Sequence, residues 1–276
     1  MAVTTHPCIF LILLQYLMNN DTIHPTAIIS PRAHIEPGVE IGPYVVVEDH
    51  VHIGSGTKIG PHAIIRSFSS LGRDNFVDAH AIIGGDPQHM SFVDSDTGVE
   101  IGDDNVIREG ATIHRAFFPG AKTRIGSNCF LMAYSHVGHD CVVADNVILT
   151  NNVVLGGHVE IGRSAIMGGC SGAHQFVRIG ALSMVAGFVP LRKDVLPFTM
   201  VGGDPVRHYR LNSVGLRRNG VDKDRYQALE TAFRALRNGG KDFSDWPDTE
   251  DVIYLREWLS MKSKYGHYGF AGKSRS

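Results

Sequence analysis

Cysteine is scarce in this chain of 276 residues, and neither sign of charge dominates it. The four cysteines show neither the spacing of a metal site nor that of a disulfide framework, so we expect a reducing, cytoplasmic setting. The net charge of −2 gives no support to a nucleic-acid-binding protein, and we expect no such partner.

A long apolar run is also missing. Residues 8–14 are apolar, but this stretch is too short to cross a bilayer, and no Lys or Arg precedes it as in a signal peptide. We therefore expect no stable membrane insertion. Residues 1–17 are interpreted as an N-terminal extension outside the fold, because the regular pattern begins only after Met18.

The charge is unevenly spread along the chain. Residues 205–276 hold 14 Lys and Arg against 9 Asp and Glu, whereas residues 1–204 hold 12 against 19. A basic tail favours an anionic partner such as a phosphate, a nucleotide or an acidic protein, although a solvated helical surface would give the same composition.

The dominant signal is an aliphatic residue at every sixth position. From residue 23 to 185 the series is suspended only twice, at residues 84–100 and 114–124, which we interpret as projecting loops. A period of six fits neither an α-helix nor one long strand. It fits a parallel β-helix, in which three hexads close a triangular coil of about 18 residues and successive coils stack. The period does not set the hand of the coil.

The pattern ends near residue 190. We therefore predict a β-helix over residues 18–190, followed by a linker and a C-terminal helical domain over residues 191–276. Within that domain, Pro and Gly make residues 191–205 a linker, and helical spacing predicts helices within 222–240 and 249–264.

Several histidines fall together once the coils are stacked. Residues about 18 apart lie one above the other, so His139 should lie beneath Gly157, and Asp140 beneath His158. His136 and His174 should lie close to the same edge. A compact cluster of imidazoles beside one acid is therefore expected.

Two kinds of chemistry suit such a cluster. An imidazole oriented by a carboxylate is a general base, and the unobstructed N–H of Gly157 could stabilise an oxyanion beside it, which together suffice for acyl transfer to an alcohol. Alternatively, three neutral imidazoles could hold zinc and activate water, as in a zinc lyase of the β-helix type. The pair His136 and His139 is three apart with an acid adjacent, whereas γ-class carbonic anhydrases, which such a lyase would resemble, place their first pair five apart.

The rod and several short motifs resemble a known family. The motifs are "HVGHDC", "GGHVEIG", "AHQFVRIG" and, in the tail, "GLRRNG", and the similarity runs from about Met18 into the tail. The chain thereby resembles the acyl-ACP–UDP-N-acetylglucosamine O-acyltransferases, hexapeptide-repeat enzymes that carry out the first step of lipid A biosynthesis. The resemblance implies an all-β, left-handed parallel β-helix with an α-helical C-terminal domain. It also implies a homotrimer with active sites between neighbouring rods, an acyl carrier protein as donor, a UDP-sugar as acceptor, and neither a metal nor a bound cofactor.

The resemblance also implies roles for individual residues. His139 matches the general base, Asp140 its orienting acid, and Gly157 the backbone oxyanion donor. A second set matches positions that bind the substrates: Gln88, His136, His158, His174, Gln175, Gly187, Asn212 and Arg218. Of these, Gly187 matches the position that limits acyl length, and Asn212 and Arg218 match nucleotide-contacting positions.

The first loop departs from the family pattern. The family usually has Pro-Gln-Asp-Leu-Lys-Tyr there, whereas this chain retains Gln88 but has His89 and Ser91 in place of the acid and the lysine. In the tail, Asn219 stands where a second arginine is common. These changes leave open another acceptor, such as a 3-amino analogue of the sugar nucleotide, and a non-catalytic paralogue.

Overall fold

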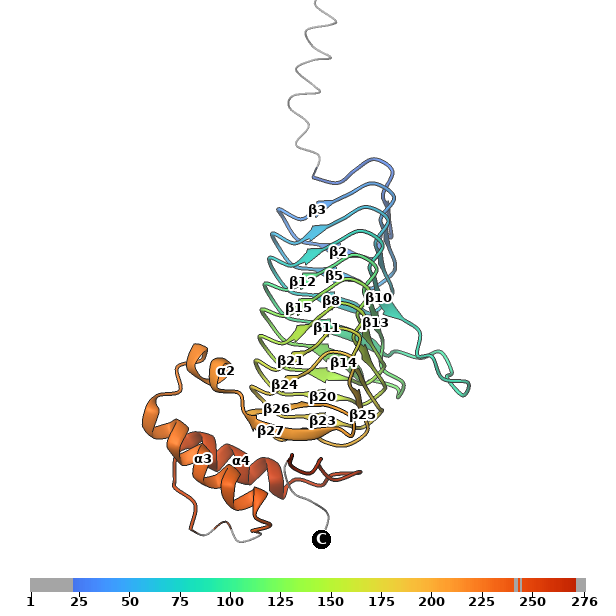
Figure 1. The fold of residues 1–276 in the computed structure, drawn as a ribbon. Helices are drawn as coiled ribbons and strands as arrows, with labels where there is room; N and C mark the ends of the chain where they lie inside the picture. Colours follow the sequence, from blue (N-terminus) through green and yellow to red (C-terminus); the bar gives the residue numbers. More distant parts are fainter. Residues whose placement is uncertain (1–21, 241–242, 244, 272–276) are drawn as a thin grey trace, which may run out of the picture.

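Short parallel strands stack into three flat faces that enclose a triangular rod, and helices pack at its C-terminal end (Figure 1). The structure, a computed structural model, describes residues 22–240, 243 and 245–271. The expected N-terminal extension, residues 1–17, lies outside the described residues. Over the described residues, no helix is both long enough and apolar enough to span a membrane.

Each face is a single sheet. The first has nine strands: β1 (Ile28–Ile29), β4 (Val46–Val47), β7 (Ile64–Ile65), β10 (Ile82–Gly85), β13 (Thr112–His114), β16 (His136–Val137), β19 (Val154–Leu155), β22 (Gly172–Ala173) and β25 (Pro190–Leu191). The second has eight: β2 (His34–Ile35), β5 (His52–Ile53), β8 (Ser69–Leu71), β11 (Gly98–Ile101), β14 (Lys122–Ile125), β17 (Val142–Val143), β20 (Glu160–Ile161) and β23 (Arg178–Ile179). The third has ten: β3 (Glu40–Ile41), β6 (Lys58–Ile59), β9 (Phe76–Val77), β12 (Val106–Ile107), β15 (Phe130–Leu131), β18 (Ile148–Leu149), β21 (Ile166–Met167), β24 (Met184–Val185), β26 (Thr199–Gly202) and β27 (Arg207–Leu211).

The chain runs around the prism from the first face to the second, then to the third, and back to the first. We call the corner between the first and second faces the first edge. The corner between the second and third faces is the second edge, and the remaining corner is the third edge. Turns at these edges repeatedly place one residue in the left-handed region, for example Asp140 at φ 59° and His158 at φ 60°. Asn, Asp and His are enriched in that region, which helps explain why polar side chains collect at the edges.

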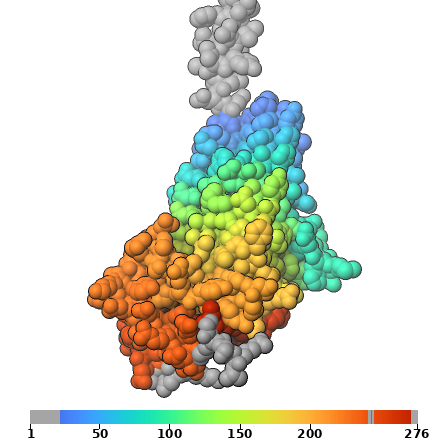
Figure 2. Space-filling view, viewed as in Figure 1, coloured from blue at the N-terminus to red at the C-terminus, as the bar shows by residue number. Residues whose placement is uncertain are grey.

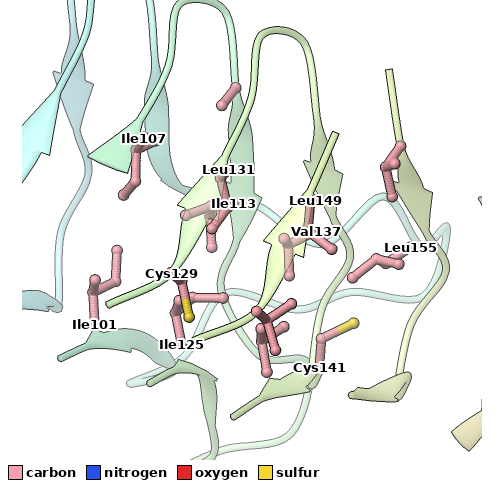
Figure 3. Packing of buried hydrophobic residues seen from close by; sticks show 14 of the residues in the cluster. Ile101, Ile107, Ile113, Ile125, Cys129, Leu131, Val137, Cys141, Leu149 and Leu155 are labelled. Carbon is pink, nitrogen blue, oxygen red and sulfur yellow. The ribbon is translucent and has the colours of Figure 1, made fainter. Parts of the chain in front are cut away.

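The second residue of a typical two-residue strand points into the prism. Side chains such as Ile107, Ile113, Leu131, Leu149 and Leu155 are fully buried and stack from coil to coil in one continuous core (Figure 3). The aliphatic residues at every sixth position in the sequence therefore form this core. The left-handed β-helix is confirmed.

Two insertions lengthen the coils at the first edge. Ile83 pairs with Ile113, thirty positions on, and Ile113 pairs with Val137, twenty-four positions on, instead of the eighteen positions of a plain coil. The added residues form loops between β10 and β11, residues 86–97, and between β13 and β14, residues 115–121. The first of these loops projects from the rod as the teal extension in Figures 1 and 2.

The rod continues past residue 190. Residues 191–205 were expected to be a linker, and this was wrong, because β26 within them pairs in parallel with β24 and extends the third face. Strand β27 then adds antiparallel to β26 and ends the sheet. Pro and Gly in this stretch lie mainly at turns and sheet ends, so their presence hid a strand.

The helices α2 (Ser213–Arg218), α3 (Lys223–Arg237) and α4 (Glu250–Ser260) follow. The two helices expected from spacing form as α3 and α4, whereas α2 was not expected. Side chains of Asp222 and Thr249 accept hydrogen bonds from the first turns of α3 and α4, as N-caps do. Arg225 of α3 binds Asp251 of α4 with two hydrogen bonds, and Asp251 is buried, so this pair fixes the two helices together.

His208 makes the folded state sensitive to acid. Its Nε2 accepts a hydrogen bond from the Leu196 N–H, and its Nδ1 donates to the Tyr268 carbonyl, so only the neutral ring satisfies both partners. Burial, aided by the nearby charge of His267, lowers the pKa of His208 to about 4, below the unfolded value of about 6.5. Stability from this residue is therefore complete above that unfolded value and is lost as the pH falls toward 4, by about 2 kcal/mol at pH 5. We expect the free energy of unfolding of His208→Gln to fall less steeply between pH 7 and 5 than that of the wild type. A slope equal to that of the wild type and of a His24→Gln control would contradict this.

Candidate active site

His139 and Asp140 form a hydrogen-bonded pair at the first edge, in the turn between β16 and β17. His139 Nδ1 lies 2.7 Å from Asp140 Oδ2, and both side chains are at least 85% buried. A carboxylate only accepts, so Nδ1 carries the proton and Nε2 is the nitrogen with a free lone pair. The pair thus has the arrangement of a general base and its orienting acid.

Asp140 is itself held in place. Its Oδ2 accepts from the backbone N–H of Phe117 at 3.0 Å, and its own N–H donates to Thr123 Oγ1 at 2.9 Å. Phe117 and Thr123 both belong to the second insertion and the strand that follows it. Sequence spacing could not place them, because the insertions shift the register of the coils that carry them.

Gly157 lies directly against the His139 ring, one coil on. A Cβ added to Gly157 would stand 2.5 Å from His139 Nε2 and 2.6 Å from Cε1, so no side chain fits there. The backbone of Gly157 is not in the left-handed region, so space rather than conformation requires glycine. Its N–H makes no hydrogen bond within the described chain and is free for a ligand beside Nε2.

His158 completes the group around Asp140. Its Nε2 is 3.8 Å from Asp140 Oδ2, and its ring stands edge-on to that of His139 at 5.2 Å. Burial lowers the pKa of His158, although Asp140 opposes this effect. A neutral His158 adds hydrogen-bonding capacity to the cleft without adding charge.

His136 forms a separate pair with His114 on the first face. The two rings meet edge-on at 4.9 Å, and His136 Nδ1 lies 2.8 Å from Thr112 Oγ1. Burial, with a smaller contribution from His114, lowers the pKa of His136 to about 4. Burial also lowers the pKa of His114, which sequence analysis did not single out. Both rings are therefore neutral at pH 7.

Cys141 follows the pair in sequence but points into the core. It is fully buried, and this burial raises the pKa of its thiol to about 12. Cysteine thiols react as thiolates, so Cys141 is a core residue and no nucleophile.

His174, Gln175 and Phe176 continue the same edge one coil further on. His174 and Gln175 are exposed, and His174 packs edge-on against Tyr265 of the C-terminal segment at 5.5 Å. Phe176 stacks flat on His158 at 4.6 Å. The expected single cluster of histidines therefore resolves into three neighbouring groups.

The first insertion brings His89 near His139. Gln88 and His89 are exposed on this loop, and the His89 ring lies 6.2 Å from the His139 ring and 4.7 Å from that of Phe117. Arg115, buried under the loop, donates to Asp86 Oδ1 and to the Ser95 carbonyl. It thereby joins the two ends of the loop.

Asn212 and Arg218 lie elsewhere in the chain, at the second edge. Asn212 is buried. Its side chain caps the N-terminus of α2 and donates a hydrogen bond to the Leu182 carbonyl. Arg218 is exposed at the end of α2. Asn219, which follows it, accepts from Ser164 Oγ at that edge. One chain alone therefore does not bring these residues to His139.

Gly187 occupies the third edge, between β24 and β25, and is exposed. Beside it, a hollow of about 470 Å³ opens on the third face, lined mainly by Met184, Ala186, Met200 and Val201. The first face joins this edge to the edge of His139, and Val154 and Gly172 are among its outward residues. Val154 and Gly172 thus give the first face apolar outward positions between the two edges.

His139, Asp140 and His158 could also hold a metal, because their ligand atoms lie within 4.8 Å of one another. However, Asp140 Oδ2 already accepts from both His139 Nδ1 and the Phe117 N–H. The only nitrogen of His139 left to bind a metal is Nε2, which points at Gly157. This donor set suits proton transfer better than coordination.

The coiled rod and the His139–Asp140 pair beside Gly157 define the class of hexapeptide-repeat acyltransferases. Two family models match the chain, the bacterial transferase hexapeptide repeat over residues 32–67 and 122–157, and domain 2 of UDP N-acetylglucosamine O-acyltransferase over residues 194–255.

Relatives make the identification more specific. An acyl-[acyl-carrier-protein]–UDP-N-acetylglucosamine O-acyltransferase of Burkholderia lata is 50% identical over 85% of this chain and 88% of its own length. The crystal structure of UDP-N-acetylglucosamine O-acyltransferase from Moraxella catarrhalis superposes with a TM-score of 0.84 at 39% identity, over 89% of this chain and 99% of that one. The enzyme of Francisella novicida gives 0.85 at 30% identity, over 91% and 95%. The chain belongs to the acyl-[acyl carrier protein]–UDP-N-acetylglucosamine O-acyltransferase family.

Proposed function

We propose that the chain transfers a 3-hydroxyacyl group from acyl carrier protein to the 3-hydroxyl of UDP-N-acetylglucosamine, in the cytoplasm, as the first step of lipid A biosynthesis. One observation carries this assignment beyond family membership. His139 Nδ1 is bound to Asp140, and Nε2 lies against Gly157, whose N–H has no hydrogen-bond partner among the described residues. The proposed base and the proposed oxyanion donor therefore lie side by side, where both can act on one reacting carbonyl group.

In the proposed reaction, His139 Nε2 takes the proton of the sugar hydroxyl as its oxygen attacks the thioester carbonyl. Asp140 stabilises the imidazolium that forms, since its carboxylate accepts from Nδ1. The Gly157 N–H binds the oxyanion of the tetrahedral intermediate. The C–S bond then breaks, the carbonyl re-forms, and the imidazolium returns its proton to the carrier thiolate.

We further propose a homotrimer, because the substrate-binding set is divided between edges. Gln88, His136, His158, His174 and Gln175 lie on or beside the first edge, whereas Asn212 and Arg218 lie at the second. A neighbouring rod that placed its second edge against the first edge of this one would unite them. Asn212 would then act mainly by positioning α2, and Arg218 would reach the nucleotide.

The acyl chain would cross the first face over the apolar outward positions of Val154 and Gly172 to reach Gly187. Each buried CH₂ contributes about 0.8 kcal/mol, so a path that stays open at Gly187 favours a chain of about fourteen carbons over one of ten. Replacement of Gly187 by Met should close the path and reverse that preference, while the chemistry at His139 continues on the short chain. Steady-state kcat/KM with ten- and fourteen-carbon acyl carriers would measure this, with Gly187→Ala as the milder control. An unchanged ratio in the Met variant would show that the chain ends elsewhere.

The experiment that tests the function is a product assay. Purified protein is incubated with 3-hydroxyacyl carrier protein and, in parallel, with UDP-N-acetylglucosamine or its 3-amino analogue, and the products are identified by mass. The second acceptor is included because His89 stands where the family has an acid. The His89 and His139 ring centres lie 6.2 Å apart, so this change is close to the proposed base. An O-acylated product supports the proposal, an N-acylated product alone would shift the acceptor, and no product with either would favour a non-catalytic paralogue.

A further inference from the structure

The first edge carries a group of basic side chains beyond the site just described. We call Arg192, Lys193 and Lys264 the edge patch. All three are exposed, and none forms an ion pair with any described residue. Unpaired like charges at one place favour an anionic partner over a purely structural role.

The patch lies in line with the base. Gly157, Gln175 and Lys193 follow His139 along the first edge at one-coil intervals, so Lys193 stands roughly 14 Å beyond the base at a coil rise of about 4.8 Å. Asp194, the nearest acid in sequence, is buried and bound to Arg178, so it does not neutralise the patch. The positive charge therefore faces outward on the edge that leads to His139.

The C-terminal segment, residues 262–270, brings Lys264 to this edge and is fixed there. The Asp194 N–H donates to the Gly266 carbonyl, the Arg192 N–H donates to Tyr268 Oη, and Tyr268 is buried against the core of the rod. These contacts hold the segment alongside the last coil. Lys264 consequently has a defined position relative to the first edge.

A row of aromatic rings runs from Lys264 to His139. Its ammonium lies 3.4 Å from the centre of the Phe176 ring, which stacks on His158 at 4.6 Å, and His158 meets His139 at 5.2 Å. A cation over an aromatic face is attracted to it and remains able to donate hydrogen bonds outward. Lys264 thus holds a positive charge at the mouth of the cleft.

We propose that the edge patch is the docking surface for the acyl carrier protein, with Lys264 binding the phosphodiester of its prosthetic arm. This inference rests on the proposed function. The acyl donor must deliver its thioester to His139 on a long arm that begins at a phosphodiester on an acidic protein. An anion-binding group a few coils from the base, on the same edge, meets both requirements.

The test separates the two substrates. In Lys264→Ala and Arg192→Ala/Lys193→Ala, we expect the KM for acyl carrier to rise about threefold each, and about tenfold or more when the changes are combined, with a weaker dependence on salt. The KM for UDP-N-acetylglucosamine and kcat at saturation should not change. Lys264→Arg, which keeps the positive charge, should leave the KM for acyl carrier close to that of the wild type. Lys223→Ala is the matched control, because Lys223 is an exposed and unpaired lysine of α3.

Two small donors identify what Lys264 binds. Acyl-phosphopantetheine retains the phosphate and should show the Lys264→Ala defect, whereas acyl-N-acetylcysteamine lacks phosphate and protein and should not. A defect with acyl-N-acetylcysteamine, or an equal rise in the KM for the sugar nucleotide, would overturn the proposal. Direct binding of holo carrier protein, measured by calorimetry without any sugar, tests the patch independently of turnover. Equal affinity of the wild type and the combined variant would overturn it even if the enzyme is active.

Discussion

Replacement of His139 by alanine should lower kcat by roughly 10²–10⁴, the usual contribution of a positioned general base. The KM for both substrates should change little, because His139 is proposed to remove the proton of the sugar hydroxyl during attack rather than to bind the sugar. Asp140→Asn should lower kcat less, since the amide can still meet the Phe117 N–H but cannot stabilise an imidazolium as a carboxylate does.

Steady-state kinetics and thermal unfolding of the same preparations would check this prediction. His62→Ala, at an exposed position on the third edge of the N-terminal coils, is the matched control for loss of an imidazole. Activity of His139→Ala within about threefold of that control would mean that another group is the base. A large drop in the unfolding temperature would instead indicate a packing defect.

Replacement of Gly157 by alanine should cost roughly 10²–10³ in kcat, comparable to the loss of an oxyanion-hole donor. The reason is geometric, because the new methyl carbon would lie 2.5 Å from His139 Nε2 and the imidazole would have to move. The Gly157 amide and the His139 base would then no longer be positioned to act on the same reacting groups. Stability should fall only modestly, since Gly157 does not need a left-handed conformation.

The control is Gly269→Ala, where an added Cβ meets only Arg207 Cδ at 3.9 Å. Single-turnover rates with acyl carrier would separate the chemical step from binding. Near wild-type turnover in Gly157→Ala would show that the glycine is required for neither the base nor the oxyanion.

Much of the rod could be predicted because one residue type repeats at one spacing. The inward position of each strand is aliphatic, so Ile53, Leu71 and Ile107 report the core directly. The same spacing predicted that His139 lies against Gly157, and the added-Cβ distance bears this out.

The remainder of the site could not be predicted from spacing. The insertions at residues 86–97 and 115–121 change the coil length, so counting by eighteen no longer places His89, Phe117 or Thr123. Lys264 reaches the edge through the C-terminal segment, whose path depends on hydrogen bonds to the last coil. Strand β26 escaped detection because turn-forming residues flank it.

The antiparallel strand β27 has a consequence for solubility. A stack of parallel coils ends in a row of unpaired backbone groups, onto which another chain could add, as in a fibril. β27 reverses the direction of the third face, and the C-terminal segment bridges to it through His208 and Phe270 and to the last coil through Asp194 and His267. The C-terminal end of the rod is therefore closed to end-to-end growth by the same segment that carries Lys264.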